Sequence, residues 1–415
     1  MIRRFGAAFL ARYGAHLTPV HRKVLAALAA CRTPAMGARI YRCKHCGKTV
    51  PVYNSCSDRH CPTCQGGRRA QWLDQRQAEL LPVEYYQVVF TVPEQLYGIA
   101  AAHPKTFYNL LFRAARETLL EVAAAPEHLG AQIGGLMVLH TWGQTLQLHP
   151  HLHVIVPGGG LRRETGSDQD ERRRSPAAES ASSPPSARWV SCPAGFFLPV
   201  AVLSAVFRGK LLDFLKQEYE AETLPMTGGL SELADAARFA QWLTALYQKD
   251  WVAFVEPPKD RAPEQALKYL ARYTYRVAIS NQRLESIEGK GPDGRVTFWY
   301  KDYARDGTWD RMTLSGVEFL RRLMQHVLPR GFVRIRPFGF LANRHRVEKL
   351  ALIRRLLPPA PPRSDPPPTA EPADDWRRRC PYCGEPALRL LGETSRPSLA
   401  SLVAATYRGL VLNSS

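Results

Sequence analysis

The sequence has no apolar run of the roughly 18 residues that a membrane-spanning helix needs. It also lacks the apolar core and small-residue cleavage site of a signal peptide, and its N-terminus instead places Arg3, Arg4 and Arg12 close together. We therefore expect a protein that stays in the cytoplasm and has no membrane partner.

Acidic residues are scarce relative to basic ones. The 415 residues contain 37 Asp and Glu against 56 Lys and Arg, which gives a formal net charge of +19. This balance predicts a polyanionic partner, with nucleic acid ahead of an anionic membrane surface. The chain is also too long for a single ordinary core, so two or three domains are expected.

Nine cysteines are present, most of them in C-x2-C pairs, and this spacing in a cytoplasmic chain favours metal ligands over disulfides. Fourteen residues separate Cys43 and Cys46 from Cys61 and Cys64, as in a zinc ribbon. Each pair supplies two thiolates from one tight turn, and four thiolates complete a closed tetrahedron around Zn²⁺. We predict a structural zinc site at these four cysteines.

Several further candidate ligands lie outside this predicted site. Cys31, Cys56, His45 and His60 could exchange into it or form a second one. The pair Cys380 and Cys383 resembles half of a metal site, which either completes a site with Cys31 and Cys56 or is vestigial. Spacing alone leaves these alternatives open.

Three regions are expected along the chain. Residues 1–80 form the zinc-ribbon domain, residues 81–357 alternate strands and helices, and residues 358–415 form a Pro-rich linker followed by a tail with the last C-x2-C pair. Within the middle region, residues 162–187 are rich in Arg, Ser, Pro, Ala and Glu and predict a disordered surface insertion.

The stretch from His149 to Gly160, HPHLHVIVPGGG, predicts a strand because a β-branched run ends in Pro and Gly. Side chains two apart on a strand share a face, so His151 and His153 point the same way and could hold a divalent metal with open positions. Taken alone, two hydrogen-bonded sheet histidines would be the simpler explanation. Residues 136–142 predict a neighbouring antiparallel strand.

Residues 263–276, PEQALKYLARYTYR, predict a helix that begins at Pro263. At helical spacing its apolar stripe is formed by Leu267, Leu270, Ala271 and Thr274. The opposite face carries Gln265, Tyr269, Tyr273 and Arg276. The apolar stripe already provides packing, so both tyrosines are available to a site.

Aromatic and basic residues alternate in the segments that follow, 296–303 and 332–339, the second of which contains Arg334 and Arg336. Aromatic rings can stack on bases while the cations hold phosphates, which suits a protein that binds single-stranded nucleic acid. Aromatic strands also build ordinary cores.

Two histidines on a strand followed by two tyrosines on one helix face resemble the HUH nucleases. The chain is more closely similar to the two-tyrosine rolling-circle transposases of the insertion-sequence ninety-one family. The matching segments run in order from about residue 31 to 350: CRTP...CKHCG...SCSDRHCPTC, HPHLHVIVPGGGL, FFLPV...FRGKLL, LKYLARYTYRVAIS, VTFWYKDY and GFVRIRPFGFLAN.

The resemblance implies an α+β fold in which an antiparallel sheet carries packed helices, with the histidine strand central and the tyrosine helix beneath the ion. His151 and His153 would hold Mg²⁺ or Mn²⁺, with Gln265 as first candidate for a third ligand and His149 or Gln144 as alternatives.

The implied reaction is transesterification of single-stranded DNA at the element ends and the target site. Tyr269 or Tyr273 would form a 5′-phosphotyrosine. The phosphates would be held by Lys268, Arg272 and Arg276, with Arg334 and Arg336 as further DNA contacts. A bacterial, nucleoid-associated protein is expected, and a homo-oligomer is one option for its assembly.

Two other functions fit parts of the same pattern. One is a plasmid-type replication initiator or relaxase, which nicks and rejoins DNA with the same paired tyrosines. The other is a zinc-ribbon DNA-binding protein without catalysis, in which the histidines and tyrosines are structural. The second alternative predicts DNA binding that is independent of divalent ions and gives no covalent product.

Overall fold

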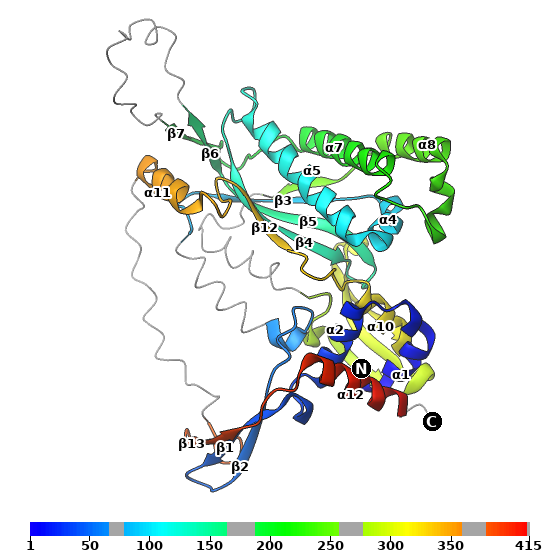
Figure 1. Ribbon diagram of the computed structural model, residues 1–415. Coiled ribbons are helices and arrows are strands. Elements are labelled where there is room, and N and C mark those ends of the chain that lie inside the picture. The colour runs from blue at the N-terminus through cyan, green and yellow to red at the C-terminus, as the bar shows by residue number, and fades with distance from the viewer. Residues whose placement is uncertain (66–78, 164–186, 257–276, 359–378, 413–415) are drawn as a thin grey trace, which may run out of the picture.

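The computed structural model describes residues 1–65, 79–163, 187–256, 277–358 and 379–412. It combines helices with sheets whose strand pairings, in the described residues, are all antiparallel. This confirms the predicted α+β class (Figure 1). None of the described helices has the length and apolar character needed to span a membrane.

A five-stranded sheet forms the middle of the molecule. In spatial order its strands are β12 (Ile335–Gly339), β4 (Gly134–Trp142), β5 (Leu148–Pro157), β3 (Tyr85–Thr91) and β8 (Ala253–Glu256). The histidine strand is therefore β5, at the centre of the sheet as expected. It pairs antiparallel with β4, which confirms the predicted neighbours.

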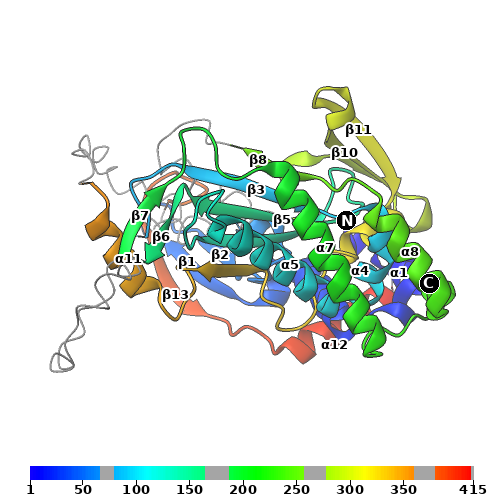
Figure 2. The ribbon, with the colours of Figure 1, turned by 90° about the horizontal axis from the view of Figure 1, so that it is seen from above.

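Alternation along β5 gives the sheet two different faces. Leu152, Val154 and Val156 are fully buried in the main core. Helices α5 and α7 cover this face, as the two views show (Figures 1 and 2). The nearby helices are α4 (Tyr97–Ala102), α5 (Pro104–Ala124), α7 (Val200–Glu220) and α8 (Ala236–Tyr247). His151 and His153 alternate with the buried residues and thus point to the opposite face.

A short hairpin extends the chain beyond β5. It consists of β6 (Gly159–Arg163) and β7 (Ala187–Ser191), with Arg163 paired to Ala187. The predicted disordered insertion, 162–187, is wrong at its ends, because Arg162 and Arg163 belong to β6 and Ala187 belongs to β7. Its residues 164–186 lie outside the described residues. Helix α11 (Arg346–Leu356) contacts β7.

A second body combines a three-stranded sheet with helices from distant parts of the chain. The sheet order is β11 (Thr308–Ser315), β10 (Arg295–Asp302) and β9 (Leu284–Glu288). Helices α10 (Gly316–Met324) and α1 (Ile2–Tyr13) pack with it. Phe5 is fully buried, and a Cβ added at Gly316 would lie 2.2 Å from its ring, so this contact depends on glycine.

The third body contains the cysteines. Its sheet has the order β13 (Leu388–Glu393), β1 (Ala38–Cys43) and β2 (Thr49–Tyr53), and it is accompanied by α2 (Pro19–Ala30) and α12 (Leu399–Leu412). The side chain of Thr18 caps α2 by accepting a hydrogen bond from the His21 amide, ahead of Pro19 in the first turn. The N-terminal and C-terminal segments thus share one sheet.

Candidate metal centres and active-site cleft

Three histidines converge on the open face of the central sheet. One ring nitrogen from each of His140, His151 and His153 lies within 4.8 Å of the others. The ring centroid of His140 is 5.4 Å from that of His151 and 4.7 Å from that of His153. His140 and His153 are 2% and 8% exposed, so the group sits in a largely desolvated position. Three imidazoles in this arrangement can hold one divalent ion and leave further positions open.

His140 was not singled out from the sequence, although its strand was. Trp142 pairs with Leu148, so a regular antiparallel ladder would place Pro150 opposite His140. The ladder shifts by one residue between His140 and Trp142, and His151 lies opposite His140 instead. The pairs from Leu136 to His140 are in regular register, and the shift falls beyond them on the side of the turn. Directly opposed residues share a face, so this register turns His140 toward the other two histidines.

A backbone carbonyl two residues earlier in the chain orients the ring of His151. His151 Nδ1 lies 2.7 Å from the carbonyl oxygen of His149. A carbonyl only accepts hydrogen bonds, so Nδ1 carries the proton and the lone pair of the neutral ring is on Nε2. Hydrogen bonds of this kind set the tautomer of metal-binding histidines.

The side-chain amide of Gln87, from β3, lies 3.1 Å from His153 Nδ1. Both groups are buried. The atom nearest the ring is Gln87 Nε2, which donates to Nδ1 as placed. A 180° turn of the amide exchanges its nitrogen and oxygen, and Gln87 would then accept the Nδ1 proton and leave Nε2 of His153 available to a metal.

The alternative third ligands occupy different positions. The Tyr97 hydroxyl lies 2.6 Å from His149 Nδ1, and burial lowers the pKa of His149. His149 is not part of the converging group of three. Gln144 lines the same cleft as the histidines. Gln265 lies outside the described residues, so its place near the ion remains a prediction.

The predicted nucleophiles and their basic neighbours also lie outside the described residues. These are Tyr269, Tyr273, Lys268, Arg272 and Arg276. Their roles therefore remain predictions.

The histidines line a cleft of about 810 Å³. One wall comes from β3, β4, β5 and the start of α4, and the other from β10 and the turn after it. Tyr300, Lys301 and Tyr303 stand on this second wall. The volume of the cleft and its mixed polar and apolar lining suit a large, charged substrate.

The two arginines of β12 and the loop before it differ in their surroundings. The Arg336 guanidinium lies 4.1 Å from the ring centroid of Phe112 and donates a 2.6 Å hydrogen bond to Asn109 Oδ1, both on α5. Arg336 therefore sits on the helix-covered face, and burial lowers its pKa. Arg334 lines a small pocket beside Arg59 and His60. The DNA contacts predicted for both arginines remain predictions.

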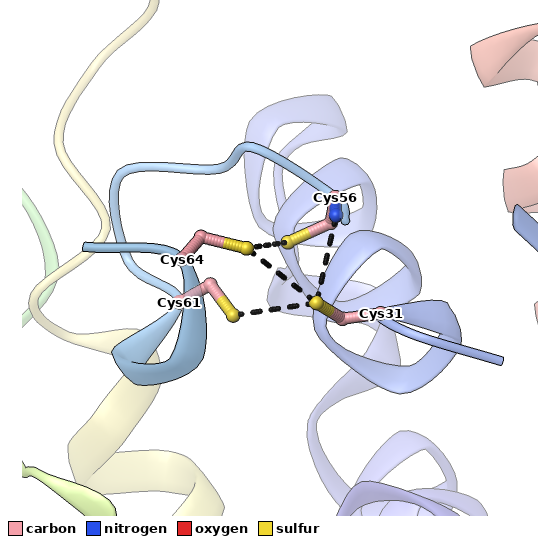
Figure 3. A group of neighbouring side chains, drawn as sticks. All are labelled: Cys31, Cys56, Cys61 and Cys64. Atoms are coloured by element: carbon pink, nitrogen blue, oxygen red, sulfur yellow. Dashed lines mark hydrogen bonds between the residues drawn. The ribbon is translucent and has the colours of Figure 1, made fainter. Parts of the chain in front are cut away.

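The predicted single zinc ribbon is wrong in its grouping, because the cysteines form two separate clusters. The first cysteine cluster consists of Cys31, Cys56, Cys61 and Cys64 (Figure 3). The second cysteine cluster consists of Cys43, Cys46, Cys380 and Cys383. In each, the four sulfurs lie within 4.8 Å of one another.

The β1–β2 hairpin explains this separation. Cys43 and Cys46 lie at its tip, whereas Cys31 precedes β1 and Cys56 follows β2. The six-residue strand β1 spans roughly 17 Å, so the tip is too far from Cys61 and Cys64 to share an ion with them. The leftover cysteines Cys31 and Cys56 thus enter the first cluster, and neither His45 nor His60 belongs to either cluster.

Both clusters have the dimensions of a thiolate zinc site. Four sulfurs at about 2.3 Å from one Zn²⁺ are about 3.8 Å apart. Cys31 Sγ lies 3.5 Å from Cys64 Sγ and 3.6 Å from Cys61 Sγ. A hydrogen bond from the Cys56 thiol lowers the pKa of Cys61, which favours the thiolate form. Four thiolates around one ion leave no open position, so an ion held by such a cluster would be structural.

Comparison with known proteins gives a consistent assignment. A family model described as "Putative transposase" matches residues 134–349, and a "Transposase zinc-binding domain" model matches residues 1–92. "Putative transposase y4qJ" of Sinorhizobium fredii (strain NBRC 101917 / NGR234) is 46% identical over 357 residues, covering 86% of this chain and 83% of the relative.

A second relative is more distant. "Transposase for insertion sequence element IS801" of Pseudomonas savastanoi pv. phaseolicola is 26% identical over 340 residues, covering 79% of this chain and 72% of the relative. No solved structure matches the chain. The first cysteine cluster lies within the residues that the zinc-binding model matches, and the three histidines lie within those that the transposase model matches. The chain belongs to the insertion-sequence ninety-one family of transposases, with that family's zinc-binding domain at its N-terminus.

Proposed function

We propose that this transposase cleaves and rejoins single-stranded DNA through a covalent tyrosine intermediate and so drives rolling-circle-type transposition of an insertion sequence. The observation that carries the proposal is the convergence of His140, His151 and His153 on the wall of the cleft. A strand-cleaving enzyme needs an electrophilic centre at the scissile phosphate, and these side chains form the one group of three histidines among the described residues.

These three histidines would bind the catalytic ion, Mg²⁺ or Mn²⁺. When bound, the ion polarises the scissile phosphate and offsets charge in the transition state. Three imidazoles favour Mn²⁺, which accepts nitrogen ligands more readily than Mg²⁺ does. The carbonyl oxygen of His149 and the amide of Gln87 hold His151 and His153 in the required orientation.

The nucleophile in this proposal is Tyr269 or Tyr273. Its Oη attacks phosphorus, an O–P bond to the tyrosine forms, and the bond from phosphorus to the 3′ oxygen breaks. The leaving oxygen takes a proton and becomes a free 3′-OH, while the 5′ end stays on the tyrosine. A 3′-OH of another strand reverses the step, so no ATP is needed. The second tyrosine can hold a second strand meanwhile.

Gln265, on the predicted tyrosine helix, would be a further ligand of the ion. Lys268, Arg272 and Arg276 would hold phosphates beside the nucleophiles. The protein would act on element ends and target DNA in the nucleoid, alone or as a homo-oligomer.

A basic and aromatic surface continues outward from the cleft along the β10–β11 hairpin. Trp299 is paired with Arg311, and Lys301 is paired with Trp309, so these four side chains share one face. The Arg311 guanidinium lies 4.5 Å from the Trp299 ring centroid, and Trp309 is 59% exposed. We name these four residues the stacking face. Exposed rings with adjacent cations can stack on unpaired bases and bind their phosphates, which supports a single-stranded substrate.

The test is a denaturing gel of the protein incubated with 5′- or 3′-labelled single-stranded oligonucleotides from the flanks of its own gene, with and without Mg²⁺ or Mn²⁺. We expect the 3′ label to move into a protein-sized band only with the ion. Tyr269→Phe combined with Tyr273→Phe should abolish the band, and Tyr275→Phe, off the predicted tyrosine face, is the matched control.

Two results would oppose the proposal. A covalent band from the double Phe variant would exclude these nucleophiles. DNA retardation on a native gel without any covalent band, on every flank tested, would favour the non-catalytic DNA-binding alternative.

A further inference from the structure

The second cysteine cluster draws its ligands from opposite ends of the sequence. Cys43 Sγ lies 3.6 Å from Cys383 Sγ, and Cys46 Sγ lies 3.6 Å from Cys380 Sγ. The zinc-binding family model matches only residues 1–92 and thus contains Cys43 and Cys46 but not their partners. The described N-terminal region therefore holds only half of this ligand set.

The two halves have the same local structure. Both read C-x2-C-G: CKHCG at 43–47 and CPYCG at 380–384. The Gly47 amide donates to the Cys43 carbonyl at 3.0 Å, and the Gly384 amide donates to the Cys380 carbonyl at 2.8 Å. Both glycines have positive φ angles, +71° and +78°, which glycine adopts without strain. Two matching turns that present their thiols to each other are the usual construction of a four-thiolate zinc site.

We propose that Cys43, Cys46, Cys380 and Cys383 bind a second structural Zn²⁺, which closes the N-terminal domain with the C-terminal segment. The zinc-binding domain is then discontinuous in sequence. The chain carries two structural zinc ions, and the second one is bound only when residues 379–412 are docked.

The sulfur geometry favours zinc over disulfides. The distance of 3.6 Å between sulfurs is far longer than the roughly 2.05 Å of a disulfide bond, and it is close to the edge of a zinc tetrahedron, about 3.8 Å. Cys43 and Cys380 are both 1% exposed. All four sulfurs converge within 4.8 Å of one another, which is the arrangement that one shared ion requires.

The backbone next to the cluster already joins the two segments. Strand β13 pairs with β1 from Arg39 opposite Glu393 to Cys43 opposite Leu388. The Arg39 and Glu393 side chains form a 2.7 Å ion pair. A Cβ at Gly37 would lie 2.7 Å from the carbonyl oxygens of Thr394 and Ser395, so only glycine permits this approach. The docking is therefore specific in register as well as in ligands.

The same segment then reaches the first cysteine cluster. The Arg396 guanidinium donates a 3.0 Å hydrogen bond to the Cys56 carbonyl. Leu402, on α12, is 3% exposed and packs with Cys56 and Cys61, while the Arg22 guanidinium of α2 lies 5.3 Å from the Tyr407 ring centroid. Release of the second zinc should thus also weaken the contacts that cover the first cluster.

The primary experiment measures zinc per full-length chain by inductively coupled plasma mass spectrometry. The wild type should hold two zinc ions, and Cys380→Ser combined with Cys383→Ser should hold one. Cys192→Ser is the matched control, because Cys192 is a half-buried cysteine outside both clusters, and it should keep two. One zinc in the wild type, or two in the double variant, would overturn the proposal.

A second measurement uses the wild type alone, so it does not depend on folding of the variant. The zinc-loaded protein is alkylated, with and without a chelator, and the labelled cysteines are mapped by mass spectrometry. Zinc should protect both pairs, Cys43 with Cys46 and Cys380 with Cys383, from alkylation. Both pairs should become reactive together when the chelator removes the zinc. Labelling of Cys380 and Cys383 while Cys43 and Cys46 stay protected would refute the shared site.

Discussion

The cysteine clusters and the histidine group differ in how completely they would surround a metal ion. Each cysteine cluster surrounds its centre with four thiols, which leaves an ion no position for substrate. The histidine group supplies three imidazoles from one side, and its other side opens to the 810 Å³ cleft. A closed centre contributes to folding, and an open one can act on a substrate. Substitutions should therefore separate loss of fold from loss of reaction.

The largest effect is expected at the first cysteine cluster. Cys56→Ser removes one of four ligands at a site 4% exposed. Structural zinc sites are worth roughly 10–16 kcal/mol in small domains, which is as large as the whole stability of an ordinary domain, about 5–15 kcal/mol. We expect loss of one zinc ion and unfolding of the N-terminal region, measured by zinc content and circular dichroism. Unchanged zinc and an unchanged melting curve would contradict this.

A histidine variant should show the reverse pattern. His140→Asn should lower metal-dependent strand cleavage by at least about 100-fold, because a ligand contributes more than the 10- to 100-fold typical of its supporting residues. Zinc content should be unchanged.

The matched control for His140 is His326→Asn. His326 is also buried, and burial lowers its pKa to about 4, but it bonds to Thr141 and to the Leu146 carbonyl and is not in the histidine group. Cleavage should persist in this variant across a titration with Mn²⁺. Equal losses in both variants would mean that His140 acts through packing alone.

Gln87 should give an intermediate effect. Gln87→Leu removes the group that faces His153 Nδ1 and should weaken binding of the catalytic ion about 10- to 100-fold. Gln87→Glu should restore it, since a carboxylate accepts the same proton. The readout is the Mn²⁺ concentration at half-maximal cleavage. An unchanged midpoint in Gln87→Leu would show that the ring of His153 is held by packing.

The smallest effect is expected on the stacking face, at the outer end of the open site. Trp309→Ala should weaken binding of a single-stranded oligonucleotide about tenfold, since loss of one stacked base costs roughly 1–3 kcal/mol. Fluorescence anisotropy without the metal ion measures binding of the oligonucleotide in the absence of cleavage. Tyr247→Ala, an exposed aromatic on α8, should bind as the wild type does. Equal binding by both variants would show that the stacking face does not contact the DNA.

Much of the architecture could be predicted because it depends on local patterns. The strand predicted at residues 136–142 forms within β4 (Gly134–Trp142). The β-branched run after His153 forms the central strand. The C-x2-C pairs do supply paired thiols, and the shared C-x2-C-G pattern at 43–47 and 380–384 was the available signal for the second cluster.

The sequence by itself determined which side chains share a face or a turn, because the spacing of residues along one strand, helix or tight turn sets the direction of their side chains. His151 with His153, and Cys43 with Cys46, follow from that rule. Only the tertiary structure decided which groups meet across the chain. His140 joins the histidines because the register of β4 with β5 places it opposite His151, and Cys43 meets Cys383 because β13 pairs with β1. Register and docking depend on packing between distant segments, which no local spacing contains.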